Sequence, residues 1–482
     1  MNIRMVGYLT GRVLIVEGML MLLSVIVGII YAERATLCFA PPIAALVLIG
    51  GLLSFKKPKN TVIYAREGMF VVAASWILLS LFGAVPFWLC GGFESVWDCF
   101  FEVVSGFTTT GASILAEPAE LPRCILFWRS FTHWIGGMGV LVFILAVMPM
   151  ADNRSLHIMR AEVPGPVVGK LVPRMKTTAK ILYGTYTVMT AVLIIMLIAG
   201  GMPVFDSFCN AFGAAGTGGF SISAAGIAAY DSVYIEIVLS VFMLLFGVNF
   251  NIYYLILIRR AREAFKNEEM RVYAVVVAVS TLIIAANIFS VYGNAGDSLR
   301  LAFFQVSSII TTTGFATADF ANHWPQFSQH ILLLLMIIGA CSGSTGGGLK
   351  ISRLILLVKS ALHDINRAIH PRSVSVLRMD GKPVEKEMLT GVKSYLAIYI
   401  IIICISVLLL SLGHFDLTTN LAAELACFNN IGPGIGLVGP MSNYSLFSPG
   451  SKMLLSLNML LGRLEIFPIL VLFTPQMWKK RV

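Results

Sequence analysis

Four short polar runs give this chain of 482 residues its clearest chemical signature. They read TTTG, GTGG, TTTG and NNIG, and they end at Gly111, Gly219, Gly314 and Gly432. Glycine permits backbone conformations that turn a carbonyl oxygen towards a bound group, and threonine adds a hydroxyl oxygen. Several such neutral oxygens together replace the hydration shell of an alkali-metal cation. The runs are therefore candidate cation-binding segments, and their candidate ligands are Thr109, Thr110, Gly111, Thr217, Gly218, Gly219, Thr312, Thr313, Gly314, Asn430, Ile431 and Gly432.

The four runs belong to an internal repeat. About ten residues of helical character precede each run, and the aligned glycines are 108, 95 and 118 residues apart. Such self-similarity indicates repeated structural units. Each unit is expected to contain a long helix, a short helix, the polar run and a second long helix. Asp98 and Asp206, thirteen residues before their glycines, fit the N-caps of two short helices, whose negative C-terminal ends would face a common point.

Polar side chains on the short helices are further candidates, because they could hydrogen-bond the backbone of the runs. They lie eight or nine residues before the aligned glycines, at Glu102, Asn210, Gln305 and Glu424.

Composition places these units in a membrane. Hydrophobic residues make up 57% of the chain and charged residues only 12%, with a mean hydropathy of +0.84, whereas soluble domains carry about 25% charged residues. A bilayer crossing takes about 20 apolar residues. Ten segments meet this requirement, two of them interrupted by charged residues, and they cover residues 13–31, 35–55, 68–93, 130–151, 181–205, 237–258, 272–296, 320–349, 394–415 and 454–477.

The membrane setting gives the polar runs a physical meaning. Unpaired backbone groups at membrane depth cost several kcal/mol each, so irregular backbone there is buried in protein or lines a cavity. Four such segments in one chain are able to line a single axis. The alternative is that their small residues only pack helices closely together. Four runs in register favour the pore over packing, although any single run would not.

The basic residues report on orientation. With the N-terminus inside, 29 of the 35 Lys and Arg residues fall in cytoplasmic segments, as the positive-inside rule requires. We therefore expect both termini to be cytoplasmic and assign the net charge of +10 to topology rather than to nucleic acid.

Signatures of catalysis are missing from the sequence. The eight cysteines form no C-x-x-C pair, and the seven histidines form no H-E-x-x-H motif. We expect a protein that is not an enzyme and has no cofactor of its own.

A glycine-rich stretch, GACSGSTGGGLK at residues 339–350, interrupts a segment that should be a crossing helix. Glycine costs about 1 kcal/mol relative to alanine at each interior helix position, so the helix is expected to break here. A phosphate-binding loop is excluded, because Leu349 separates the last glycine from the lysine. Tight helix packing and a mobile gate beneath the polar runs remain alternatives. The candidate gating residues of the stretch are Gly343, Gly346, Gly347, Gly348 and Lys350.

Arg463 is the second candidate gating feature. It lies inside the last apolar segment, in NMLLGRLEIF, and a charge in such a position normally faces the protein interior with a partner. Glu465 is two residues away on another helix face and is a poor intrahelical partner. A snorkelling or purely structural arginine is the alternative.

Together these motifs resemble the Trk/Ktr/HKT superfamily of potassium transporters, and within it the membrane subunits of bacterial Trk systems. The resemblance covers essentially the whole chain and rests on TTTGA, GTGGF, TTTGF, NNIGPG, GACSGSTGGGLK and GRLE. It implies potassium as the substrate, a selectivity filter at the four runs, an intramembrane gating loop at the glycine-rich stretch, and a pore-facing role for Arg463. No run contains the full TVGYG sequence of potassium channels.

The resemblance also implies partners that the residues alone do not reveal. It implies a homodimer in the bacterial cytoplasmic membrane and a TrkA-like cytosolic subunit whose domains bind the regulatory nucleotide. That subunit is expected to dock on the basic loops at residues 151–180 and 350–393. Two mechanisms stay open: a gated channel-like path, and a symporter that couples potassium to protons or sodium. None of the four runs contains Asp, Glu or His, which favours the channel.

The expected fold is an all-α polytopic membrane protein. Four helix–pore-loop–helix repeats form a pseudo-fourfold arrangement that resembles a potassium channel, preceded by a pair of N-terminal helices. The expected units are residues 1–66 for the N-terminal pair and 67–176, 177–270, 271–385 and 386–482 for the four repeats.

Overall fold

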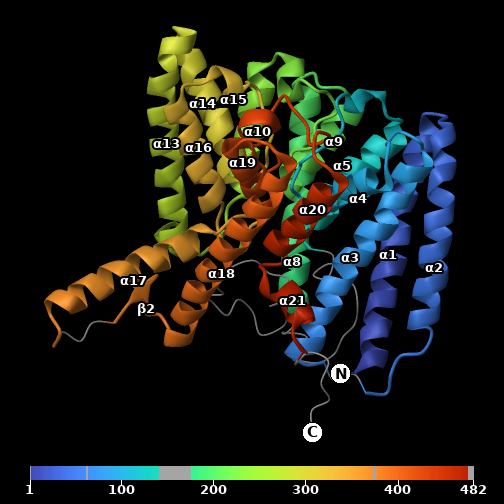
Figure 1. The fold of residues 1–482 in the computed structure, drawn as a ribbon, viewed down its shortest axis with the longest axis horizontal. Coiled ribbons are helices and arrows are strands. Elements are labelled where there is room, and N and C mark those ends of the chain that lie inside the picture. Colours follow the sequence, from blue (N-terminus) through green and yellow to red (C-terminus); the bar gives the residue numbers. More distant parts are fainter. Residues whose placement is uncertain (1, 61–62, 140–174, 373–375, 476–482) are drawn as a thin grey trace.

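The computed structural model describes residues 2–60, 63–139, 175–372 and 376–475, and its regular structure is almost entirely helical. The long helices run side by side in one bundle (Figure 1). A two-stranded antiparallel hairpin, β1 (Arg378–Met379) and β2 (Lys382–Pro383), lies towards the end of the bundle where α1 begins (Figure 1).

Six helices are long and apolar enough to cross a membrane alone, and two bent helix pairs raise the number to eight among the described residues. The chain is therefore a multi-pass membrane protein. Helices occupy all ten predicted segments, but the second half of the segment 130–151 lies outside the described residues. The six long helices are α1 (Ile3–Ile30), α2 (Ala40–Ser54, extended by a 3-10 turn at Arg34–Phe39), α3 (Ala65–Leu89), α8 (Met175–Ala199), α13 (Glu268–Tyr292) and α18 (Lys386–Leu410).

The N-terminal pair consists of α1 and α2, which pack closely through glycines. A Cβ atom placed on Gly11 would lie 2.8 Å from the carbonyl oxygen of Gly50, and one on Gly50 would lie 2.6 Å from that of Gly11. Small residues let membrane helices approach in this way. Helix α1 also packs on α3 and on α5 (Arg123–Gly137), so the pair is attached to the first repeat.

All four repeats have the predicted order of elements. The long helices α3, α8, α13 and α18 come first. Short helices follow at α4 (Val96–Phe107), α9 (Val204–Gly216), α14 (Ala295–Ile310) and α19 (Leu417–Phe428), and each leads into one polar run. The second helices are α5, α10 (Val233–Phe246), α16 (Gln326–Ile338, after the short α15 at Phe320–His323) and α20 (Pro449–Arg463). The fold class predicted from the sequence is confirmed.

The second helices break more often than the sequence predicted. The expected break in the third repeat is present, because α16 ends at Ile338 and α17 (Ile351–Ile369) begins only after the glycine-rich stretch. The second repeat also bends by 89° between α10 and α11 (Phe250–Leu257), and the fourth bends by 116° after α20, where α21 (Phe467–Leu470) follows. The bend of the second repeat follows Gly247, the C-cap of α10, and that of the fourth repeat lies at Glu465 and Ile466, which both have positive φ.

Two elements lie outside the repeat plan on the same side of the bundle as the hairpin. The short α12 (Ala261–Lys266) joins the second repeat to the third. Helix α17 extends sideways from the bundle (Figure 1). The hairpin is tied to the start of α13, because Asp380 accepts hydrogen bonds from the Asn267 side chain at 3.0 Å and from the Glu268 backbone at 2.7 Å.

Candidate functional site

The four short helices end in the same backbone motif. The residues at the turn, Thr109, Thr217, Thr312 and Asn430, all have φ between 54° and 58°. The next N–H in each repeat donates to the carbonyl five residues earlier, at 2.8–2.9 Å, which is the Schellman pattern at a helix C-terminus. Glycine usually occupies that left-handed position, and threonine is an outlier there. Three threonines held in this conformation are a localised strain of the kind that clusters at functional sites.

The aligned glycines bring the four runs into a closed ring. A Cβ atom on Gly111 would lie 1.9 Å from the Gly218 carbonyl oxygen. The corresponding distances are 1.9 Å from Gly219 to the Thr313 oxygen, 2.0 Å from Gly314 to the Ile431 oxygen, and 2.7 Å from Gly432 to the Thr110 oxygen. Each repeat thus contacts the next one in chain order, and the fourth contacts the first. All four glycines have φ between 69° and 97°.

The ring offers neutral oxygen atoms and little else. In the first and third repeats, two threonine hydroxyls hydrogen-bond each other at 2.8 Å, Thr108 with Thr110 and Thr311 with Thr313. In the fourth repeat the Asn430 side chain donates to the Thr110 hydroxyl at 3.0 Å and joins the first and last runs. A cavity of about 110 Å³ adjoins the ring and is lined by all four aligned glycines.

The four predicted polar side chains on the short helices differ in whether they hydrogen-bond near a polar run. Glu102 accepts hydrogen bonds from the Ser113 hydroxyl at 2.8 Å and from the Ile114 N–H at 3.0 Å, just after the first run, and it pairs with Arg129 at 2.7 Å. The other three do not hydrogen-bond the runs among the described residues. Asn210 donates to Tyr230 at 3.1 Å, Glu424 accepts from Asn458 at 2.7 Å, and the Gln305 amide has no hydrogen-bond partner there.

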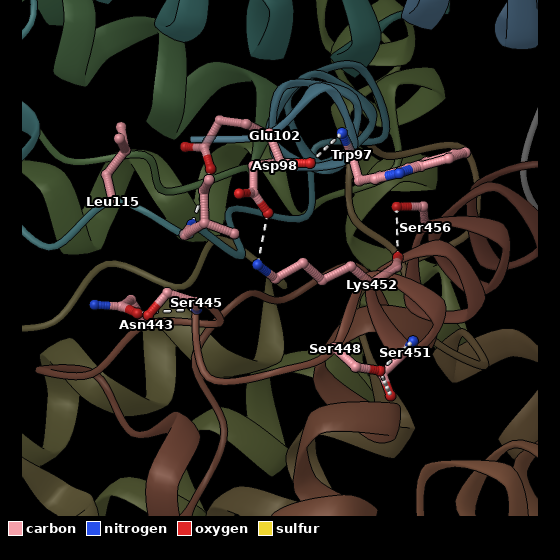
Figure 2. Close-up of polar contacts among 12 residues, drawn as sticks. Trp97, Asp98, Glu102, Leu115, Asn443, Ser445, Ser448, Ser451, Lys452 and Ser456 are labelled. Atoms are coloured by element: carbon pink, nitrogen blue, oxygen red, sulfur yellow. Dashed lines mark hydrogen bonds and ion pairs between the residues drawn. The ribbon is translucent and has the colours of Figure 1, made fainter. Parts of the chain in front are cut away.

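The N-cap prediction is wrong for both aspartates. Helix α4 is capped by Ser95 and α9 begins after Pro203, so Asp98 and Asp206 fall in the first turn, because each helix starts one turn earlier than predicted. Asp98 instead forms a buried ion pair with Lys452 at 2.6 Å. Figure 2 shows Lys452 extending from α20 to Asp98, across the contact between the fourth and first repeats.

The glycine-rich stretch lies directly against the ring. The N–H of Gly347 donates to the Thr312 hydroxyl at 2.6 Å. A Cβ atom on Gly347 would lie 2.3 Å from the Asn429 carbonyl oxygen, and one on Gly346 would lie 2.9 Å from that of Thr311. The stretch therefore covers the third and fourth runs on the side where the short helices end.

The other predicted gating residues of the stretch hold its shape. The Lys350 ammonium donates to the Gly346 carbonyl oxygen and folds the stretch back on itself. Gly348 has φ of 76°, and its Cβ would lie 2.8 Å from the Cα atom of Gly339. Gly343 lies apart from the ring, beside Asn249 at the bend of the second repeat.

Arg463 joins three repeats. From the end of α20 its guanidinium donates to the Thr345 carbonyl at 2.7 Å, and to the Gly136 and Gly137 carbonyls at 2.5 Å and 2.8 Å. The side chain is buried, so the interior position expected for it is correct. The arginine connects the glycine-rich stretch to the end of α5 in the first repeat.

Glu269 is a residue that the sequence did not single out. It lies at the start of α13, and its carboxylate accepts hydrogen bonds from the Ser342 N–H at 2.6 Å and the Ser352 N–H at 3.1 Å. Ser342 lies near the start of the glycine-rich stretch and Ser352 lies two residues after its end, so one buried carboxylate holds the stretch on both sides of its glycines. A glutamate in the first turn of a helix is common and carries no signal of this role.

Comparisons with known proteins agree with this architecture. A family model described as a cation transport protein, TrkH, matches residues 38–480. The potassium uptake protein TrkH of Salmonella typhimurium is 34% identical over the full length of both chains, and TrkG of Escherichia coli is 31% identical over 99% of each chain. The crystal structure of the potassium transporter TrkH from Vibrio parahaemolyticus matches with a TM-score of 0.90 and 30% identity, covering 99% of this chain and 100% of that one.

The family model covers far more than half of the chain, and the similar proteins are matched from end to end. The chain belongs to the TrkH family of cation transport proteins.

Proposed function

We propose that this protein takes up potassium across the cytoplasmic membrane through a gated, channel-like pore. The observation that carries the proposal is the closed ring of Gly111, Gly219, Gly314 and Gly432, in which each glycine contacts a carbonyl of the next repeat. A ring of backbone carbonyls is the structure that replaces a potassium ion's hydration shell. The potassium uptake named for the TrkH and TrkG relatives supports the same substrate.

The chemistry of the ring favours a passive path. Its oxygens come from carbonyls, hydroxyls and one amide, and none of the four runs contains a titratable side chain. Coupling to protons would require a titratable group on the path, so ions move through this ring down their electrochemical gradient. The candidate ligands from Thr109 to Gly432 are the proposed ion-binding residues of the selectivity filter.

The glycine-rich stretch is the proposed gate. It lies against the third and fourth runs through Gly347 and Gly346, so it obstructs the path of an ion that leaves the ring. Arg463 holds the stretch through Thr345 and places a positive charge at the same level. Opening requires these hydrogen bonds to break and the stretch to move aside.

The cytoplasmic side is the proposed place of control. The gate continues into α17, and the hairpin at residues 378–383 is tied to the start of α13. A TrkA-like subunit that carries the nucleotide and docks here could pull on the gate through α17. The predicted docking loop at residues 151–180 lies outside the described residues up to residue 174. A homodimer is part of the same proposal.

Rubidium-86 uptake into proteoliposomes that contain only this chain tests the proposal. We expect uptake driven by an outward potassium gradient, little inhibition by sodium, and no dependence on imposed proton or sodium gradients. Uptake that requires either of those gradients would replace the channel with a symporter.

A further inference from the structure

The second polar run differs from the other three by what it lacks. The first and third runs carry a pair of hydrogen-bonded threonines on either side of their left-handed residue, Thr108 with Thr110 and Thr311 with Thr313. The fourth run carries Asn429 and Ile431 in the same places. The second run has only Gly216 and Gly218, so two side chains are missing from this part of the ring.

A residue from the first repeat fills the space beside these two glycines. His133 lies on α5, is fully buried, and packs against both glycines of the second run. A Cβ atom on Gly218 would lie 2.5 Å from the imidazole Cγ and Nδ1 atoms, and one on Gly216 would lie 2.2 Å from the His133 carbonyl oxygen. The imidazole thus packs against Gly218, and the His133 backbone packs against Gly216.

The backbone itself does not require glycine at position 218. Its φ lies outside the left-handed range that disfavours side chains, in contrast to φ of 69° at Gly219. The imidazole alone accounts for the three nearest atoms that a Cβ at Gly218 would meet. Gly218 is therefore glycine because His133 is beside it, and the two residues form a complementary pair.

The contact between α5 and the second run continues beyond this pair. The imidazole stacks on Phe220 with ring centroids 4.2 Å apart, and the Arg129 guanidinium lies 3.6 Å from the centroid of the same ring. Arg129 also donates to the Ser221 carbonyl at 2.9 Å. The second run is thus braced along its length by a helix of the first repeat.

We propose that His133 is a positioning residue of the filter: its imidazole supplies the missing side chain of the second run and fixes the Gly218 carbonyl. That carbonyl oxygen is the one that Gly111 contacts in the ring. The proposal rests on the proposed function of the ring as a selectivity filter. A filter discriminates between potassium and sodium only while its carbonyls stay in place, so His133 contributes to selectivity without touching the ion.

Three variants in proteoliposomes test the pair: Gly218→Ala, His133→Ala and the double variant. Rubidium-86 uptake and its inhibition by sodium are measured for each. Because the new Cβ would displace the buried imidazole, we expect Gly218→Ala to lower uptake about tenfold or more. His133→Ala leaves a cavity beside the carbonyl, and we expect sodium discrimination to fall about tenfold while uptake persists. The double variant removes the clash and refills part of the space, so we expect both measurements to return to within about threefold of the wild type.

Two results would overturn the proposal. One is unchanged sodium discrimination in His133→Ala. The other is a Gly218→Ala effect of equal size with and without His133. Gly314→Ala, measured in parallel, separates this inference from the proposed function. If Gly314→Ala abolishes selective uptake while the His133 variants behave as wild type, the filter stands and the role of His133 is wrong. If Gly314→Ala leaves selective uptake intact, the proposed filter is itself wrong.

Discussion

The ring of polar runs and the glycine-rich stretch touch each other, but different contacts hold them. In the ring, glycines lie against backbone carbonyls of the next repeat, closer than any side chain could fit. The glycine-rich stretch also packs glycines on backbone carbonyls, but in addition it forms hydrogen bonds with side chains of other elements, among them Thr312, Glu269 and Arg463.

This difference matches the two tasks of an ion pathway, which are to select the ion and to open and close the path. In the ring, every aligned glycine packs on a carbonyl of a neighbouring repeat, which suits a fixed set of ion ligands. Hydrogen bonds from a few side chains break one at a time and leave the partner helices folded, which suits a part that moves. The comparison predicts that changes in the ring alter selectivity, whereas changes in the stretch alter the rate of flux at unchanged selectivity.

The largest effect is expected from a methyl group in the ring. In Gly314→Ala the new Cβ would lie 2.0 Å from the Ile431 carbonyl oxygen, at φ of 83°. Because that oxygen belongs to backbone and cannot rotate away, we expect selective rubidium uptake to fall about 100-fold or more.

Gly293→Ala is the matched control for this substitution. Gly293 has φ of 65° at the end of α13, but no atom lies within 4 Å of the space that its Cβ would enter. It carries the same backbone strain without the clash, so uptake should stay near that of the wild type. Equal losses in both variants would mean that strain, rather than ring geometry, causes the defect.

The next effect is expected from removing the gate. Deleting Ser342–Gly347 removes the contacts of the stretch with Glu269, Thr312 and Arg463. We expect rubidium uptake to rise about tenfold, since hydrogen bonds that hold the stretch in place are lost, while inhibition by sodium stays unchanged. Wild-type flux in a folded deletion protein would argue against the gate, and a loss of sodium discrimination would argue against the division of tasks.

The order of the elements could be predicted from sequence because glycines and threonines recur at fixed distances from long apolar segments. The ring could be anticipated from four runs such as Thr312–Gly314, since irregular backbone at membrane depth needs a common cavity. Closure of that ring through Thr110 and Asn430 joins residues 320 positions apart, and no local pattern encodes such a contact. Glu269 was missed for the same reason, because its partners lie 73 and 83 residues away.

A smaller rise in flux is expected from the arginine alone. Arg463→Ala removes three hydrogen bonds to backbone carbonyls and one positive charge, but it leaves the Thr312 and Glu269 contacts in place. We expect uptake to rise about threefold, consistent with the loss of part of the tether energy.

Arg463→Lys distinguishes the loss of the three hydrogen bonds, which tether the stretch, from the loss of the positive charge. Lysine keeps the charge but cannot reach three carbonyls with the geometry of a guanidinium. Flux close to that of Arg463→Ala would identify the tether as the main restraint, and flux close to the wild type would identify the charge. Wild-type flux in both folded variants would exclude the arginine from gating.

The smallest effect on transport is expected at the outer contact between the first and fourth repeats. Lys452→Met leaves Asp98 as a buried carboxylate without the ammonium that now lies 2.6 Å away. Breaking one partner of a buried pair costs about 3–5 kcal/mol, so thermal unfolding in detergent should begin at a lower temperature. Lys452→Met combined with Asp98→Asn should recover most of that loss, because no unpaired charge remains.

Sodium discrimination should stay within about twofold of the wild type in both variants, since the ring keeps its backbone contacts and the Asn430–Thr110 hydrogen bond. A loss of discrimination in the single variant would show that the ring depends on the outer ion pair. The geometry of the filter would then be set by the whole contact between the first and fourth repeats.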